Sequence, residues 1–250
     1  DISWMYARHN SKYIHIIDAR NPAHYAFQHI GGAVNIPVDE TFSTGERKDF
    51  VGRIKSINEI FNKSGINNDD GVVVYDDGSF LDAARLFWVF EIFGHKKVSI
   101  MDGGFSLWLE KHLPTDNKEV TPKPSSYITT VSPARLATKF RTRLAIDNPY
   151  VTIVDARTPS EFFGIVSRAN RLGHIPGSIN VPVTNNFSQA NGFISLKSDS
   201  ELASLYSDLK VAKKVITYCN RGKESAATYF VLRKLGYDVS AYDGSWMEWG

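Results

Sequence analysis

The residues best suited to chemistry surround the single cysteine of the chain, Cys219. One cysteine excludes an internal disulfide and a zinc site built from several thiolates, which leaves a buried inert thiol or a reactive one. Six residues follow it: Asn220, Arg221, Gly222, Lys223, Glu224 and Ser225. Arg221 and Lys223 bring two positive charges, and Gly222 suits a tight turn whose backbone N–H groups surround the sulfur. The loop therefore predicts a reactive thiol with a lowered pKa.

The elements on either side of this loop favour the same interpretation. Residues 215–218 form a β-branched run that is typical of a central strand in a parallel sheet. An apolar ladder predicts a helix that begins near Ser225 and stops at Gly236. Ligands of open α/β sheets bind at the carboxyl ends of strands, and the amino end of a helix favours an anion. Cys219 is thus expected at an anion-binding strand end.

The two halves of the chain carry the same landmarks in the same order, which indicates an internal duplication. Four pairs of segments match: 14–20 with 151–157, 29–38 with 174–183, 72–75 with 215–218, and 98–108 with 239–249. Aligning Tyr75 with Tyr218 places Asp76 opposite Cys219. Only the second copy therefore carries the candidate nucleophile.

Helical patterns lie between the predicted strands. Apolar residues at helical spacing run from Phe50 to Phe61, and a second set begins at Leu202 after Ser198, a candidate N-cap. Strands that alternate with helices predict an α/β fold, with a parallel sheet flanked by helices in each half.

A polar segment with three prolines separates the two copies and shows no sustained periodicity. We therefore expect an N-terminal domain over residues 1–112, a linker over 113–131 and a C-terminal domain over 132–250. Because Cys219 lies in the last of these, the C-terminal domain is the expected catalytic one.

The bulk composition excludes several classes of partner. There are 29 basic and 27 acidic residues, a net charge of +2, which is too small a field to indicate nucleic acid or an anionic membrane as a partner. The longest apolar runs are too short to cross a bilayer, and Asp1 opens the chain without a signal-peptide pattern. These features favour a cytoplasmic location, or a periplasmic one if a signal peptide has been removed.

Four motifs together resemble the tandem-domain rhodaneses, the thiosulfate and 3-mercaptopyruvate sulfurtransferases. The motifs are Asp-Ala-Arg at 155–157, Gly-His-Ile-Pro-Gly-Ser-Ile-Asn at 173–180, Tyr-Cys-Asn-Arg-Gly-Lys-Glu at 218–224 and Asp-Gly-Ser-Trp at 243–246. The resemblance spans essentially the whole chain, and a cysteine confined to the C-terminal copy is typical of the family. It implies two tandem rhodanese-like domains and a sulfurtransferase that needs no cofactor or metal.

By this resemblance, the Cys219 thiolate takes a sulfur from a small anionic donor and holds it as a persulfide. The acceptor is then cyanide, a small thiol or a thioredoxin-like protein, and the residues from Asn220 to Ser225 bind the donor. Thiosulfate enzymes of the family tend to carry cations after the cysteine, so Arg221 and Lys223 favour thiosulfate, with mercaptopyruvate as the alternative. Glu224 departs from the family, because a threonine is frequent there.

A second departure lies four residues past Arg157, where several relatives place a substrate-binding arginine and this chain has Glu161. Arg168 and Arg171 are the candidate substitutes. Arg157 and His174 have counterparts in Arg20 and His29 of the half without a nucleophile, so we expect them to be structural.

Two other functions are alternatives to sulfur transfer. A phosphatase of the cell-cycle type has a similar thiolate loop, but it needs an arginine at the position of Ser225 to grip phosphate, which argues against that class. A non-catalytic sulfur-carrier or regulatory binding protein is the second alternative, since the first half has the same pattern without the cysteine.

Overall fold

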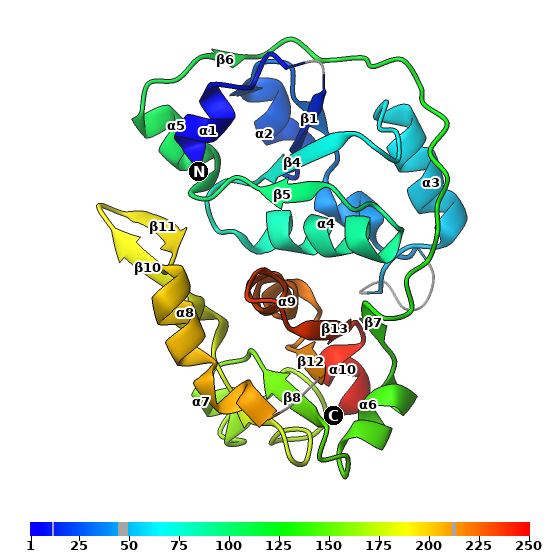
Figure 1. The fold of residues 1–250 in the computed structure, drawn as a ribbon, viewed down its shortest axis with the longest axis vertical. Helices are drawn as coiled ribbons and strands as arrows, with labels where there is room; N and C mark the ends of the chain where they lie inside the picture. Colours follow the sequence, from blue (N-terminus) through cyan, green and yellow to red (C-terminus); the bar gives the residue numbers. More distant parts are fainter. Residues whose placement is uncertain (12, 45–49, 212–213) are drawn as a thin grey trace. The chain divides into compact units, whose positions relative to one another are not determined.

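The computed structural model describes residues 1–11, 13–44, 50–211 and 214–250. The chain divides into two units, Asp1–Ser132 with Gln189–Ser195, and Pro133–Ser188 with Leu196–Gly250. Each unit contains a parallel sheet flanked by helices (Figure 1). The predicted α/β class, with one such sheet in each half of the chain, is confirmed.

The first unit is built on a four-stranded parallel sheet in the order β3-β1-β4-β5. Its strands are β1 (Ile14–Asp18), β3 (Val34–Asn35), β4 (Gly71–Tyr75) and β5 (Val98–Ile100). Its helices are α1 (Ile2–Tyr6), α2 (Pro22–Phe27), the 3-10 helix η1 (Val38–Thr41), α3 (Ile54–Lys63), α4 (Leu81–Ile92) and α5 (Gly104–Glu110). Side chains from α1, α2 and α5 pack with Ile16, Val73 and Tyr75 into one buried cluster. Because side chains alternate along a strand, Ile17 and Val74 face the other side, where α4 covers β4.

The second unit has a five-stranded parallel sheet in the order β7-β13-β12-β8-β9. Its strands are β7 (Leu136–Ala137), β8 (Val151–Asp155), β9 (Ile179–Asn180), β12 (Lys214–Tyr218) and β13 (Asp238–Tyr242). Its helices are α6 (Lys139–Ala145), α7 (Pro159–Phe162), η2 (Val183–Asn186), α8 (Asp199–Leu205), η3 (Ser207–Val211), α9 (Lys223–Lys234) and α10 (Ser245–Trp249). Strands β10 (Phe187–Ala190) and β11 (Phe193–Leu196) form a separate hairpin.

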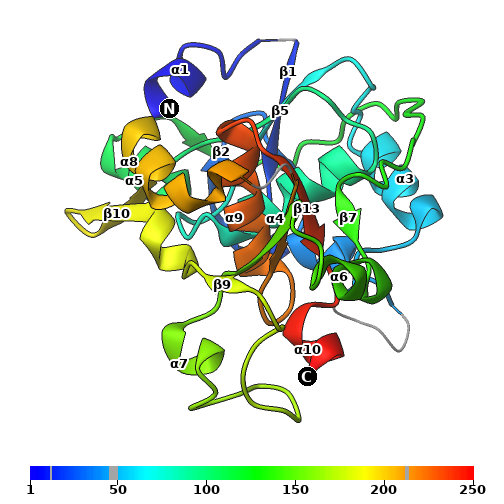
Figure 2. The ribbon, with the colours of Figure 1, turned by 60° about the horizontal axis from the view of Figure 1, so that its bottom comes forward.

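The central strand β12 and the helix α9 place the candidate nucleophile. Val215 and Ile216 are both buried, as expected for a strand covered on both faces. Helix α9 contacts both β12 and β13, and Figure 2 shows it beside β13. The helix begins at Lys223, two residues before the expected start at Ser225, so Lys223 and Glu224 belong to its first turn.

Of two predicted helix starts, the structure agrees with the one at Ser198 and differs from the one at Phe50. Ser198 caps α8 as expected: its hydroxyl accepts from Glu201 N–H, and the Glu201 side chain bonds back to the Ser198 backbone. Helix α3 begins at Ile54, whereas Phe50 precedes it and belongs to a turn. The periodicity therefore located the buried face of α3, including Ile57 and Phe61, better than its first residue.

Residues 113–131, expected to be a linker, are anchored on the first unit. Strand β6 (Thr115–Asp116) pairs antiparallel with β2 (His29–Ile30). Tyr127 is buried, its hydroxyl donates to Phe93 O at 3.2 Å, and its carbonyl accepts from Asn58 Nδ2 at 2.8 Å. These contacts hold a segment that has no long helix or strand of its own.

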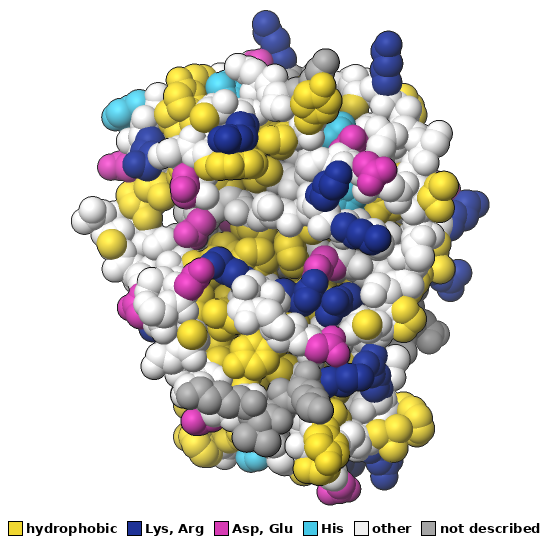
Figure 3. All heavy atoms as spheres, viewed as in Figure 1, with side chains coloured by type: hydrophobic (Ala, Val, Ile, Leu, Met, Phe, Trp, Pro, Cys, Tyr) yellow, Lys and Arg dark blue, Asp and Glu magenta, His cyan; other side chains and the backbone are white. Residues whose placement is uncertain are grey.

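The surface shown in Figure 3 carries basic and acidic side chains interspersed with each other. This distribution agrees with the small net charge of the sequence. Within the described part of the chain, no helix is long and apolar enough to cross a membrane.

Candidate active site

Cys219 directly follows β12, and its side chain is fully buried. Gly222 precedes the first residue of α9 and has a φ of 92°, a left-handed conformation that glycine adopts without strain. This turn aims the Gly222 N–H at the sulfur, and the nitrogen lies 3.0 Å from Sγ. The strand end, the glycine turn and the helix amino end therefore meet at the thiol, as predicted.

Two serine hydroxyls also approach the sulfur. Sγ lies 3.4 Å from Ser225 Oγ in the first turn of α9, and 4.0 Å from Ser245 Oγ at the start of α10. Ser245 Oγ additionally accepts from Cys219 N–H at 3.2 Å and donates to Tyr242 O at 2.8 Å. We call residues 219–225 the catalytic loop, after the role expected for Cys219. Ser245 thus ties the catalytic loop to the end of β13.

The prediction of a lowered thiol pKa is wrong for this arrangement. Burial, the negative charge of Glu224 and a hydrogen bond between the Cys219 and Glu224 side chains together raise the pKa of Cys219 to about 12. The hydrogen bond from Ser225 acts in the opposite direction but does not outweigh them. The sequence pattern identified the cations near the loop, but it gave too little weight to burial and to Glu224.

The loop residues differ in how they are placed. Asn220 and Ser225 are buried, Lys223 and Glu224 are half-buried, and Arg221 is exposed. All of them lie within six residues of Cys219 in the sequence.

Of the two candidate substitute arginines, Arg168 is linked to the catalytic loop by its side chain, through the carboxylate of Glu161. Arg168 Nε lies 3.5 Å from Glu161 Oε1, and Asn220 Nδ2 donates to that same oxygen at 2.8 Å. The Arg171 side chain is exposed, and only its carbonyl is tied to the site, accepting from Trp246 Nε1 at 3.3 Å. The structure therefore links Arg168 to Cys219 more directly than Arg171.

Glu161 occupies the third position of α7, where its second oxygen completes a capping box with Thr158. Burial favours a raised pKa for this carboxyl, but the hydrogen bonds from Asn220 and Thr158 and the charge of Arg157 outweigh burial and lower its pKa. Glu161 is thus a buried carboxylate that accepts a hydrogen bond from Asn220, the residue after Cys219.

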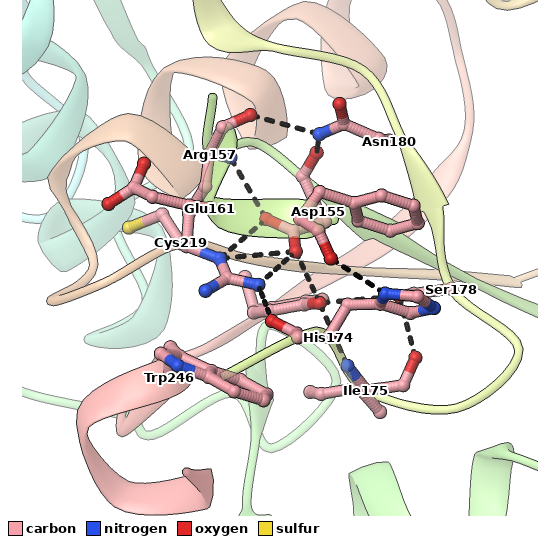
Figure 4. A network of polar contacts seen from close by, with 12 residues as sticks. Asp155, Arg157, Glu161, His174, Ile175, Ser178, Asn180, Cys219 and Trp246 are labelled. Carbon is pink, nitrogen blue, oxygen red and sulfur yellow. Dashed lines mark hydrogen bonds and ion pairs between the residues drawn. The ribbon is translucent and has the colours of Figure 1, made fainter. Parts of the chain in front are cut away.

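Figure 4 shows a buried network next to this site, built around the carboxylate of Asp155. Arg157 binds it with two nitrogens, at 3.0 and 2.6 Å, and the Tyr218 hydroxyl donates to it at 2.5 Å. The first unit repeats the arrangement with Asp18, Arg20 and Tyr75. Because the copy without a cysteine has the same network, the geometry supports a structural role for Arg157.

His174 and its counterpart His29 also make equivalent contacts, which supports a structural role for both. His174 Nδ1 lies 2.8 Å from Phe162 O and the ring stacks on Phe162, while His29 Nδ1 lies 2.7 Å from Tyr25 O and stacks on Tyr25. Both histidines therefore fix the turn before a short strand.

Sequence reasoning missed the role of Ser245. This residue has a φ of 48°, which is unfavourable for a side chain other than glycine, and its equivalent in the first copy is Gly104, also left-handed at 57°. The mismatch between Asp-Gly-Gly in one copy and Asp-Gly-Ser in the other was the available signal. A serine kept where the backbone favours glycine points to a use for its hydroxyl.

Comparison with known proteins assigns the family. The model of the rhodanese-like domain matches residues 1–111 and again residues 137–250. The chain is a member of the rhodanese-like domain family. Its two copies are two rhodanese domains in tandem, and the sheet of each unit is the core of one of them.

Relatives of this tandem rhodanese are enzymes of sulfur transfer. It is 35% identical over 266 residues to the thiosulfate sulfurtransferase of Corynebacterium glutamicum, covering 99% of this chain and 86% of that protein. Among solved structures, SseA of Escherichia coli, a 3-mercaptopyruvate sulfurtransferase, is 28% identical with a TM-score of 0.86 and coverage of 98% and 97%. The tandem rhodanese is therefore an enzyme of the sulfurtransferase kind.

Proposed function

We propose that this protein transfers a sulfane sulfur from thiosulfate, through a persulfide on Cys219, to cyanide or a thiol. The Cys219 thiolate attacks the outer sulfur of thiosulfate, the sulfur–sulfur bond of the donor breaks, and sulfite leaves with the bonding electron pair. Cyanide or a thiolate then attacks the outer sulfur of the persulfide and releases the Cys219 thiolate. This is covalent nucleophilic catalysis in two steps.

The observation that carries the proposal is the contact between Gly222 N–H and Cys219 Sγ at 3.0 Å. A backbone donor at the amino end of a twelve-residue helix stabilises negative charge on the sulfur. The same donor serves the thiolate that attacks and the thiolate that leaves. An inert core cysteine has no need of such a donor.

The high thiol pKa has a consequence for the first step. At neutral pH the Cys219 thiol holds its proton, so that proton must leave before sulfur is transferred. Loading is therefore expected to be the step most sensitive to charge in this loop.

Two observations favour thiosulfate as the donor. Arg221 and Lys223 place two cations within four residues of the nucleophile, and Arg168 presents an exposed guanidinium nearby. The relative from Corynebacterium glutamicum is named for the same donor. Arg171 stays a weaker candidate for donor binding, because only its carbonyl contacts the site.

Mercaptopyruvate is the second candidate donor, favoured by the likeness to SseA over nearly the full length of both chains. Its carboxylate would meet the same cations, while its sulfur would face Cys219. The thiolate would attack that sulfur, the carbon–sulfur bond would break, and pyruvate would leave as its enolate with the bonding electron pair. A direct comparison of the two donors therefore has to accompany any test.

For the acceptor, the loop chemistry admits cyanide, a small thiol or a thioredoxin-like protein. We place the activity in the cytoplasm, where reduced thiols are abundant. A non-catalytic carrier would share the fold and the loop, and it would fail to turn over with every one of these acceptors.

The test is to incubate the reduced protein with thiosulfate or with mercaptopyruvate and to measure the intact mass. We expect one added sulfur on the wild-type protein and none on Cys219→Ser. An Asp76→Ser variant changes the equivalent loop of the first unit and is expected to load normally. If neither donor adds sulfur, the proposed function fails.

A further inference from the structure

The segment after α7 exposes an unusual set of large apolar side chains. Phe163 is 72% exposed, Ile165 73%, Val166 50% and Leu172 64%. We call residues 163–172, which carry these four side chains, the apolar loop. Figure 2 shows the segment between α7 and β9 as a long excursion that passes beside α10. Several large apolar residues exposed together on one surface mark an interaction site more often than chance exposure does.

The apolar loop is joined to the catalytic loop by hydrogen bonds. Trp246 Nε1 donates to Ser167 Oγ at 3.1 Å, and the Trp246 backbone N–H donates to Cys219 O at 2.9 Å. On its other side, Arg168 reaches Asn220 through the Glu161 carboxylate. A partner bound to the apolar loop would therefore touch the residues that hold both sides of the Cys219 loop.

The charge of this surface indicates the kind of partner. Residues 162–198 contain no aspartate or glutamate, while Arg168 and Arg171 lie between the exposed apolar residues. The Glu161 carboxylate that pairs with Arg168 is buried, whereas 71% of the Arg168 side chain is exposed. The surface is thus apolar and cationic, which complements an apolar and acidic one.

We propose that the apolar loop docks an acidic protein that carries a reactive thiol and accepts the sulfur from Cys219. This inference rests on the proposed function and names its acceptor. A small anion such as thiosulfate would use the arginines but would gain nothing from Phe163, Ile165 and Leu172. A protein surface uses both, because interface cores are apolar and their rims are charged.

The transfer step conserves atoms and electrons. The acceptor thiolate attacks the outer sulfur of the Cys219 persulfide, and a new sulfur–sulfur bond forms on the acceptor. The bond to Cys219 breaks, and its electron pair stays on the Cys219 sulfur as a thiolate. The acceptor leaves as a persulfide, so no external oxidant or reductant is consumed.

The test uses the full chain loaded with sulfur and an acidic thioredoxin whose resolving cysteine is replaced by serine. Intact mass gives the rate at which sulfur leaves Cys219 and appears on the thioredoxin. The variant Phe163→Ser/Ile165→Ser/Leu172→Ser is compared with Phe140→Ser/Leu144→Ser, which removes two exposed apolar residues from α6 of the same unit. Discharge by cyanide serves as the reaction that needs no docking.

We expect the triple variant to lower the second-order rate with thioredoxin about tenfold or more and to leave discharge by cyanide within about twofold. The α6 variant should change neither rate. Raising the ionic strength should slow transfer to thioredoxin and not to cyanide, because the attraction between opposite charges is screened.

The proposal is overturned if the triple variant discharges to thioredoxin at the wild-type rate, or if it slows thioredoxin and cyanide equally. It is also overturned if the triple substitution abolishes sedimentation with phosphatidylserine vesicles while transfer to thioredoxin is unchanged, since the loop would then bind lipid. Failure of the wild-type protein to load sulfur would instead refute the proposed function.

Discussion

The amide of Asn220 donates a 2.8 Å hydrogen bond to the carboxylate of Glu161, which joins the residue after the nucleophile to helix α7. Both side chains are buried, and the other oxygen of Glu161 is used by the capping box of α7. Glu161 thus acts as a positioning residue: it holds Asn220, and through Asn220 the start of the catalytic loop.

Replacing Glu161 should separate its charge from its hydrogen bonds. Glu161→Ala leaves the Asn220 amide without its acceptor and should lower kcat about tenfold with a smaller change in KM, because the loop is mispositioned. Glu161→Gln keeps one acceptor oxygen for Asn220 Nδ2 and gives up the acceptor for Thr158 N–H, so it should retain more of the activity than Glu161→Ala. Steady-state kinetics with thiosulfate measure both. Equal losses in the two variants would show that the charge of Glu161, and not its geometry, matters.

Removing the charge of Glu224 should make the thiol more acidic. The Glu224 carboxylate is the second cause, after burial, of the raised pKa of Cys219. Glu224→Gln should therefore lower that pKa, so that the thiolate fraction at neutral pH increases. The pH dependence of iodoacetamide alkylation, followed by intact mass, reports the shift, and loading from thiosulfate should become faster at pH 7. A lowered pKa combined with a collapse of turnover would mean that Glu224 instead takes the thiol proton.

Much of the fold follows from local patterns in the sequence. The β-branched run from Val215 to Tyr218 predicted a buried strand, and the structure shows one. The matched segments 14–20 and 151–157 contain Asp18 and Asp155, around which the structure shows equivalent networks. The order of these landmarks sufficed because each strand and the turn after it are specified within about ten residues. The nucleophile was found in the same way, from the asymmetry between Asp76 and Cys219.

The parts of the site that escaped prediction depend on long-range contacts. Glu161 is separated from Asn220 by 59 residues, and Ser245 from Cys219 by 26. No local spacing reports such a pair. The thiol pKa failed for a related reason, since the burial that dominates it is contributed by side chains from several elements.

The free energy of unfolding should depend on pH through Asp76, which lies in the loop of the first unit that is equivalent to the catalytic loop. Asp76 is buried and accepts from the backbone N–H groups of Gly78, Phe80 and Ala83, and burial raises its pKa to about 6. The folded protein thus binds this proton more tightly than the unfolded chain does. The stabilisation is present below about pH 4 and is lost as the pH rises through 6.

The matching experiment compares the wild type with Asp76→Asn, which cannot titrate. Between pH 4 and pH 7 the difference in unfolding free energy should move in favour of the variant by about 2 kcal/mol. Urea unfolding at several pH values measures it. A difference that does not vary with pH would contradict the raised pKa of Asp76.

Ser245 allows the backbone conformation and the hydroxyl to be tested apart. Ser245→Gly restores the residue found at the equivalent position of the first unit, Gly104, and relieves the left-handed strain at φ 48°. Ser245→Ala keeps the strain. Both remove the hydroxyl that accepts from Cys219 N–H and approaches Sγ.

We expect both variants to lose activity to a similar extent, about tenfold in kcat/KM, because each leaves the catalytic loop without the same hydrogen bonds. The glycine variant should be the more stable of the two by about 1 kcal/mol, since glycine adopts the left-handed region without penalty. Thermal unfolding and thiosulfate kinetics on the same samples give the two quantities. Wild-type activity in Ser245→Gly would show that the serine hydroxyl plays no part in catalysis, and that its approach to the sulfur is only a matter of packing.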